Sequence, residues 1–139
     1  ALSNQPAWKA WSGYAFESIC YKHISQIKKV LQIPEGSEVF TWRYVSDQQG
    51  EDGVQIDLLF DRPDGAVHFC EIKYCKSPFK IDKQYAKQLL YREKIYRKVA
   101  KTNKQIFHAM IVSSGLQQTL YSEELISGVV TLDDLFRDA

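Results

Sequence analysis

Apolar positions along this chain follow two different periods. Between residues 12 and 31 they recur every three or four positions, which predicts an amphipathic helix that ends before Pro34. Aromatic and β-branched residues are concentrated in residues 39–45, 54–61 and 66–74, which predicts three strands. The sequence Arg-Pro-Asp-Gly at residues 62–65 suits a tight turn, so we expect the last two strands to pair as an antiparallel hairpin.

The second half of the chain contains one long helix and one strongly apolar strand. Residues 105–113 are largely apolar, as in a central parallel strand that is buried on both faces. The order of elements predicts an α/β domain, with a mixed central β-sheet flanked by helices on both faces. Residues 82–100 have helical spacing, with a core-facing stripe of Tyr85, Leu89, Tyr96 and Val99. The expected shorter elements are a helix at 120–126, a strand at 129–131 and a helical turn at 132–136.

Length and composition suit one globular domain. The chain has 139 residues, of which 45% are apolar. It contains no run of about 18 apolar residues, so no membrane span is expected, and no signal peptide is visible. The chain begins without Met, so we expect it to be part of a longer protein. Residues 1–10 are interpreted as a linker or N-terminal extension, and residues 11–139 as the domain.

The three cysteines, Cys20, Cys70 and Cys75, form no disulfide framework. An odd number of cysteines favours a reducing compartment, so we expect a cytoplasmic protein. His68 together with Cys70 and Cys75 could suggest zinc, but their spacing matches no usual ligand pattern. We favour the alternative interpretation, in which the cysteines pack in the core.

The predicted hairpin carries an unusual set of charges. Asp57 lies in one strand, and the sequence Glu71-Ile72-Lys73 lies in the next. Side chains alternate along a strand, so Glu71 and Lys73 point to the same face, and strand pairing can bring Asp57 beside them. Two carboxylates and an ammonium group on one face are costly unless they hold a cation or a phosphate. The alternative is a plain ion pair between Asp57 and Lys73 on an exposed face.

This arrangement resembles the motif of the PD-(D/E)xK nuclease superfamily. In that motif an Asp on one strand precedes Glu-x-Lys on the next, and an acidic residue lies on a preceding helix; here the helical residue would be Glu17. The resemblance implies a restriction-endonuclease-like fold and a magnesium or manganese ion held by Asp57, Glu71 and the carbonyl of Ile72. Lys73 would orient the attacking water or neutralise developing charge. Glu17 would bind a second ion or a metal-bound water, or else is simply an exposed helix residue.

Several segments are more closely similar to one subgroup, the C-terminal nuclease-like domain of prokaryotic AAA-type ATPases. These segments are GYAFE at residues 13–17, IDLL at 56–59, EIK at 71–73 and AMIVSSGL at 109–116. The resemblance implies an ATPase domain as a partner. The chain has no P-loop motif, so such an ATPase would lie outside it.

Charge is distributed very unevenly. Residues 73–104 contain eleven basic residues and two acidic ones, Asp82 and Glu93, which makes a net charge of +9 within a chain whose total is +1. Such a block predicts a surface for nucleic acid, with DNA as the expected partner, although a solvated helix face is the alternative. Gln84 and Gln88, one helical turn apart, could contact a phosphate or hold Lys73, or form an ordinary polar face. The expected contacts to nucleic acid are Lys76, Lys80, Lys83, Lys87, Gln88 and Lys94.

These features favour a domain that binds DNA and cleaves it with a metal ion. Two alternatives stay open. One is a catalytically silent DNA-binding or regulatory module of an AAA-type ATPase. The other is a protein-interaction domain that docks through Trp8, Trp11 and Tyr14, unless these aromatic residues pack on the domain itself.

Overall fold

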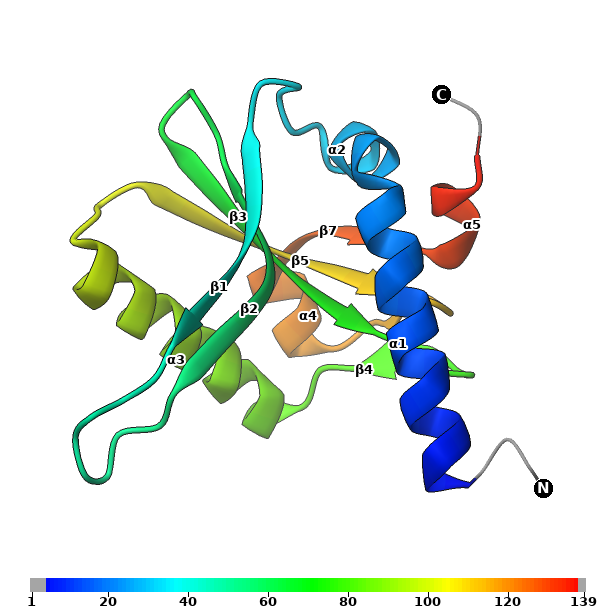
Figure 1. Ribbon diagram of the computed structural model, residues 1–139, viewed down its shortest axis with the longest axis horizontal. Coiled ribbons are helices and arrows are strands. Elements are labelled where there is room, and N and C mark those ends of the chain that lie inside the picture. The colour runs from blue at the N-terminus through cyan, green and yellow to red at the C-terminus, as the bar shows by residue number, and fades with distance from the viewer. Residues whose placement is uncertain (1–4, 138–139) are drawn as a thin grey trace.

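A computed structural model describes residues 5–137, and its N-terminal region forms two helices (Figure 1). Helix α1 spans Pro6–Lys22 and helix α2 spans Ile24–Leu31. Between them His23 leaves the helical conformation, and its amide bonds the carbonyl of Cys20, three residues back. The single helix predicted for residues 12–31 is therefore wrong at two points, since it starts earlier and is interrupted.

Helix α1 extends into the segment that we interpreted as a linker. Proline suits the first turn of a helix, and α1 begins at Pro6. Residues 1–4 lie outside the described residues. Trp11 and Tyr14 are 62% and 74% exposed, so these two rings do not pack on the domain. Their role in docking a partner stays a prediction.

The core of the fold is a five-stranded mixed sheet, which confirms the predicted α/β class. Its order is β1-β2-β3-β5-β7, with antiparallel pairing from β1 to β3 and parallel pairing from β3 to β7. A second sheet pairs β4 with β6 in parallel. The strands of the large sheet are β1 (Glu38–Tyr44), β2 (Val54–Asp61), β3 (Ala66–Lys73), β5 (Gln105–Val112) and β7 (Ile126–Val130), and those of the small sheet are β4 (Phe79–Lys80) and β6 (Leu116–Gln117).

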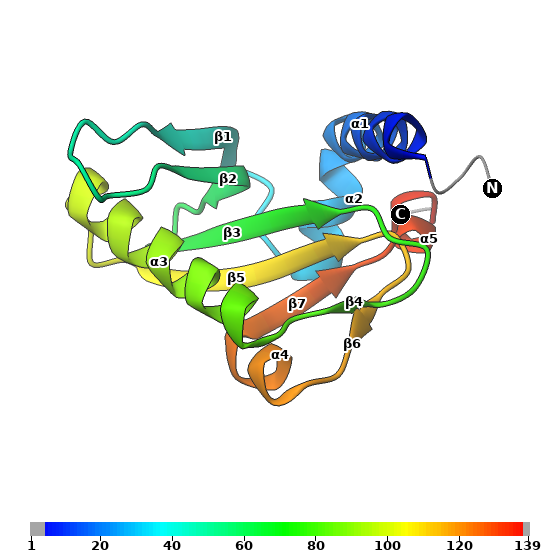
Figure 2. The same cartoon turned by 90° about the horizontal axis from the view of Figure 1, so that it is seen from below.

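Alternate side chains of the central strands belong to different apolar clusters. Cys70 and Ile72 of β3 pack in one cluster with residues of α1, α2 and α5 (Leu132–Leu135). Val67 and Phe69, on the other face of β3, pack in a second cluster with residues of α3 (Lys83–Ala100). Figure 2 shows α3 and α4 (Leu120–Leu125) on the side of the sheet opposite α1. Strand β3 therefore lies between the two groups of helices and is almost wholly buried.

Helix α3 begins where its sequence predicts and buries a slightly different stripe. The side chain of Asp82 caps its N-terminus by accepting a hydrogen bond from the amide of Tyr85 at 2.8 Å. Leu89 and Tyr96 are buried as expected. Val99 is 43% exposed, and the core takes Ile95 instead, because the apolar cluster ends at the turn of Tyr96.

The predicted hairpin of β2 and β3 is confirmed, and β2 contains a bulge. The amide of Arg62 bonds the carbonyl of Ala66 across the turn, where Gly65 has a φ of +86°. Phe40 pairs with Leu59, but Trp42 pairs with Ile56, so β2 holds one extra residue around Asp57.

Within residues 5–137, no helix is both long enough and apolar enough to cross a membrane.

Candidate active site

Asp57 lies where β2 and β3 separate. The last pair of the antiparallel ladder is Leu58 with Cys70, so Asp57 is the first residue beyond it. Its Oδ2 atom accepts a hydrogen bond from the amide of Ile72 at 2.9 Å, in the place of a ladder bond. On the other edge of β2, the hydroxyl of Thr41 donates to the carbonyl of Asp57 at 3.0 Å. The bulge and these two bonds direct the Asp57 carboxylate into the gap between the strands.

Glu71 reaches the same gap from β3. Its side chain is 4% exposed, and the nearest cation is Arg92, whose Nε atom lies 3.7 Å from Oε1. Within the described part of the chain, Oε1 is buried and has no hydrogen-bond partner. Burial raises the pKa of Glu71 to about 8, the nearby Asp57 carboxylate adds to that rise, and Arg92 opposes it. The structure therefore brings Asp57 and Glu71 together, and burial beside Asp57 disfavours the charged form of Glu71 while Arg92 favours it.

Lys73 lies on the same side of β3 as Glu71, beside an aromatic ring. Its Nζ atom is 5.6 Å from the centroid of Tyr85, and the Cζ atom of Arg92 is 5.8 Å from the same centroid. Among the described residues no ion pair joins Lys73 to Asp57. The alternative prediction of a cross-strand ion pair between these two residues is therefore wrong. Lys73 is half-buried and close to the acidic residues of the gap.

Glu17 approaches from α1. It is half-buried and accepts a hydrogen bond from the Tyr21 hydroxyl at 3.0 Å. Burial raises the pKa of Cys20 to about 12, and the charges of both Glu17 and Asp57 add to that rise. The charges of Glu17 and Asp57 therefore both act on the Cys20 thiol, which is buried in the cluster under α1.

The oxygen atoms in this gap fit one hard divalent cation. In a ladder the N–H and C=O of one residue point to the same neighbouring strand, so the Ile72 carbonyl faces the gap with its amide. That carbonyl, Asp57 and the unpartnered Oε1 atom of Glu71 make a set of oxygen ligands that magnesium or manganese prefers. Between residues 5 and 137 no three or more His, Cys, Asp or Glu side chains form a group that could hold a metal ion, so Glu17 does not join Asp57 and Glu71 in one such cluster.

A metal ion at this gap should need both carboxylates. Replacing Asp57 by Ala is expected to abolish magnesium or manganese binding, because it removes one of two charged ligands and the acceptor that holds the Ile72 amide. Titration calorimetry measures the loss. Asp61→Ala is the matched control, since Asp61 lies at the far end of β2 and pairs with Lys104. Equal metal binding by Asp57→Ala and the parent would contradict a shared site.

The basic block is partly neutralised by acidic side chains. The residues expected to contact nucleic acid are all exposed: Lys76, Lys80, Lys83, Lys87, Gln88 and Lys94. Other basic residues of the block form ion pairs within 4 Å, namely Arg92 with Glu71, Arg97 with Glu93, Lys98 with Glu51 and Lys104 with Asp61. The exposed lysines on and before α3 therefore carry most of the charge that is left for a partner.

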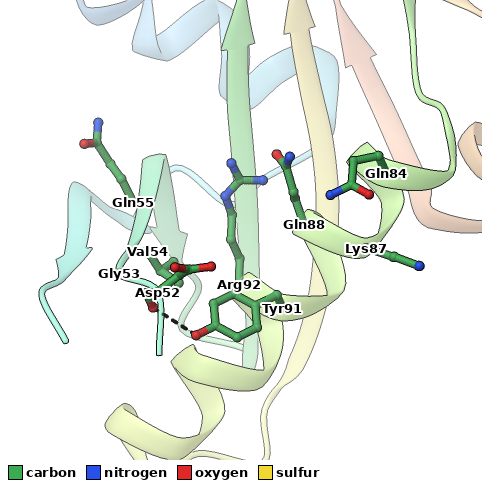
Figure 3. A pocket seen from close by; sticks show the side chains of 9 residues that line it. All are labelled: Asp52, Gly53, Val54, Gln55, Gln84, Lys87, Gln88, Tyr91 and Arg92. Carbon is green, nitrogen blue, oxygen red and sulfur yellow. Dashed lines mark hydrogen bonds between the residues drawn. The ribbon is translucent and has the colours of Figure 1, made fainter. Parts of the chain in front are cut away.

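A cleft of about 480 Å³ runs along the same face of α3 (Figure 3). One wall is formed by α3 residues, including Gln84, Lys87 and Gln88, and the other by residues 52–55 before and in β2. The Tyr91 hydroxyl donates to the carbonyl of Asp52 at 2.9 Å and ties the two walls together. Arg92 lines this cleft and also contacts Glu71, so this side chain lies between the cleft and the Glu71 carboxyl group.

Tyr85 and Arg92 are site residues that the sequence reasoning did not single out. Tyr85 was assigned to the core stripe of the helix, and Arg92 was counted only as part of the basic block. They stand seven residues apart, on one face of α3, on either side of the buried Leu89. Arg92 lies on the face of α3 that carries the buried Leu89. A charged residue on such a face is unusual, and this could have marked Arg92 as a site residue.

Within the described range, residues 5–137, the cysteine and histidine residues form no second metal-binding group. Cys20 and Cys70 are buried in the cluster under α1, as the packing interpretation expects. His68 is buried, and its ring stacks on Phe107 at 5.1 Å between centroids.

Comparison with known proteins identifies a fold relative alone. No family model matches the sequence, and no curated protein matches it. A crystal structure of AF1548, described as a protein of unknown function, is similar with a TM-score of 0.50 and 15% sequence identity. The similarity covers 81% of this chain and 56% of that one, so the chain spans little more than half the length of its structural relative.

Proposed function

We propose that this domain binds DNA and hydrolyses phosphodiester bonds with a bound magnesium or manganese ion. The observation that carries the proposal is the meeting of Asp57 and Glu71 in the gap between β2 and β3, with one buried carboxylate oxygen left without a partner. A protein that buries two carboxyl groups together gains little stability from them. Their arrangement is understandable if a cation holds both.

Each residue of the gap has a distinct part in this reaction. Asp57, Glu71 and the Ile72 carbonyl hold the cation, which acts as a Lewis acid on the phosphoryl group when bound. Lys73 orients the attacking water and offers positive charge to the phosphoryl oxygens. Glu17, on the α1 side of Asp57, fixes a water molecule or a second ion.

The substrate strand would approach along α3. Lys87 and Gln88 line the cleft beside Arg92, and Lys83 and Lys94 are exposed on the same helix. The charge of these lysines would draw the phosphate backbone toward the carboxylates.

The ion pair between Arg92 and Glu71 supports a second candidate function. A guanidinium beside a metal-ligating carboxylate competes with the cation for it. If the Arg92 guanidinium keeps Glu71 from binding the cation, the domain is a catalytically silent DNA-binding or regulatory module. Under either function we propose, from the resemblance, that it works in the cytoplasm next to an AAA-type ATPase. Buried, unpaired cysteines such as Cys20 and Cys70 suit that reducing compartment.

A digestion assay separates the two functions. Linear, nicked and branched DNA is incubated with the domain in magnesium and in manganese, alone and together with the ATPase. Cleavage that requires metal and disappears in Asp57→Asn supports hydrolysis. DNA binding without cleavage under every condition would contradict hydrolysis and leave the regulatory module.

DNA binding through α3 should depend steeply on salt. Replacing three of its lysines together by Gln is expected to weaken binding and to flatten the log–log salt slope by roughly 0.9 for each lost phosphate contact on duplex DNA. Fluorescence anisotropy over a range of salt concentrations measures both. The variant replaces Lys83, Lys87 and Lys94, and the matched control replaces Lys9, Lys22 and Lys29, which are exposed on α1 and α2. An unchanged slope in the first variant would place the DNA elsewhere.

A further inference from the structure

Two buried hydrogen-bond donors near the carboxylates have no partner in the described part of the chain. They are the Nη1 atom of Arg92 and the hydroxyl of Tyr85. Buried donors are almost always satisfied in folded proteins, because leaving one unpaired costs free energy. The two groups lie side by side, because Arg92 acts as a hydrogen-bond partner on the Tyr85 phenol, and Arg92 also lines a cleft. An acceptor from outside the chain would complete the donors that are left over.

The guanidinium of Arg92 is only partly used by Glu71. Its Nε atom is the atom that faces the carboxylate, and at 3.7 Å it is beyond the usual length of a charge-assisted hydrogen bond. The Nη1 atom is therefore still able to donate elsewhere. The side chain is 19% exposed, since one part of it is buried over Tyr85 and another part lines the cleft.

The Tyr85 hydroxyl is a neutral donor at the same place. Burial raises the pKa of Tyr85, so the hydroxyl keeps its proton. The ring lies within 6 Å of both the Lys73 ammonium and the Arg92 guanidinium. Tyr85 therefore lies between Arg92, which lines the cleft, and Lys73, the residue that we assign to the attacking water.

The cleft wall adds further donors. Gln84, Lys87, Gln88 and Arg92 line it from successive turns of α3, and in Figure 3 the Gln88 amide lies next to the Arg92 guanidinium. Asp52 lines the cleft from the opposite wall, and in Figure 3 its carboxylate points toward the α3 wall, so an anion would have to bind nearer to Arg92 and Gln88 than to Asp52. A volume of about 480 Å³ is in the range of ligand clefts, roughly 300–1,000 Å³.

We propose that Arg92, Tyr85 and Gln88 form a binding subsite for a backbone phosphate of a nucleic acid strand, next to the phosphate that is cleaved. The planar fork of arginine suits two phosphate oxygens at once, whereas lysine offers a point charge. The subsite rests on the proposed function in that the phosphate belongs to the substrate strand. Arg92, Tyr85 and Gln88 are positioning residues here, since they hold the strand in register with the carboxylates.

Tyr85→Phe is the sharpest test, because it removes one buried hydroxyl for which residues 5–137 provide no acceptor. If the hydroxyl binds no ligand, its removal leaves DNA binding unchanged, whatever its effect on stability. If it binds phosphate, affinity for DNA falls by about threefold or more while thermal unfolding shows no loss of stability. Binding is measured by anisotropy with labelled single-stranded and duplex oligonucleotides in EDTA, so that nothing is cleaved.

Arg92→Met tests the charge. It is expected to weaken DNA binding by about tenfold or more and to lower the salt slope by roughly 0.7–0.9, which corresponds to one lost phosphate contact. Arg92→Lys should restore the slope but only part of the affinity, because it keeps the charge and loses the fork. Lys101→Met is the matched control, since Lys101 is exposed at the C-terminal end of the same helix. Tyr85→Phe should leave the slope unchanged.

Each outcome decides the proposal. The subsite is overturned if Arg92→Met binds DNA as tightly as the control Lys101→Met and if Tyr85→Phe binds DNA as tightly as the parent. The subsite is also overturned if the binding of inorganic phosphate depends on Arg92 but the affinity for DNA does not. That result would indicate a site for a small anion. Arg92-dependent DNA binding without cleavage in manganese keeps the subsite and removes hydrolysis. If the domain cleaves DNA but its affinity for DNA is unchanged in the Arg92 and Tyr85 variants, the proposal of hydrolysis stands and the subsite is rejected.

Discussion

Replacing Lys73 by Ala should slow DNA cleavage on the order of a hundredfold or more while metal binding is largely kept. The two effects separate because Lys73 acts on water and on phosphoryl charge, whereas Asp57 and Glu71 hold the ion. Lys73 contributes no ligand oxygen, and its Nζ atom lies beside the Tyr85 ring rather than in an ion pair with Asp57. The loss should therefore concern the rate and spare the calorimetric binding of manganese.

The measurement is cleavage of a labelled duplex in manganese by the parent and by Lys73→Ala, at equal protein concentration and with the fold verified. Lys29→Ala is the matched control, because Lys29 is an exposed lysine on α2 that is not among the expected contacts to nucleic acid. Similar rates for Lys73→Ala and the parent would remove Lys73 from the mechanism. No cleavage by either protein, with DNA still bound, would favour the regulatory module.

Most of the fold follows from the period of the apolar residues. The buried strands β3 and β5, the tight turn before β3 and the start of α3 all lie where apolar runs and turn residues predict them. The break at His23 could not be read in this way, because the apolar spacing continues through it. Helical spacing reports which side of a helix is buried, and it is insensitive to a local change of backbone direction.

The site was less accessible to sequence reasoning, and the bulge in β2 shows why. Strict alternation along β2 would place Leu59 on the same face as Asp57. The extra residue shifts the pattern, so that Ile56 and Leu59 pack toward α3 and Leu58 packs toward α1. A bulge depends on pairing with Thr41 in another strand, and that pairing has no signature in a single sequence.

The contact between Arg92 and Glu71 has the same kind of origin. The residues are far apart in the sequence, and they meet only because α3 crosses the sheet over β3. The resemblance pointed to Asp57, Glu71 and Lys73, and the structure brings these three near one another. Their roles in metal binding and cleavage stay predictions.

Replacing Glu71 by Gln should stabilise the metal-free domain at alkaline pH. The pKa of Glu71 is raised from 4.5 to about 8 in the folded protein, mainly by burial. Protonated Glu71 therefore contributes stability that is fully present below about pH 4.5 and is lost as the pH rises through about 8. At 1.36 kcal/mol per pKa unit, the upper limit of the loss is about 5 kcal/mol. The amide of the Glu71→Gln variant would resemble the protonated carboxyl group at every pH and avoid this loss.

Urea unfolding in EDTA at acidic, neutral and alkaline pH measures the difference. The free energy of unfolding should be similar for Glu71→Gln and the parent in acid, and the variant should gain a few kcal/mol over the parent at alkaline pH. Glu124→Gln, at an exposed position on α4, is the matched control and should show no such pH-dependent gain. Manganese should reverse the order, because it stabilises only a protein that binds it. A parent and variant that respond equally to pH and to manganese would show that Glu71 is neither a strained carboxyl group nor a ligand.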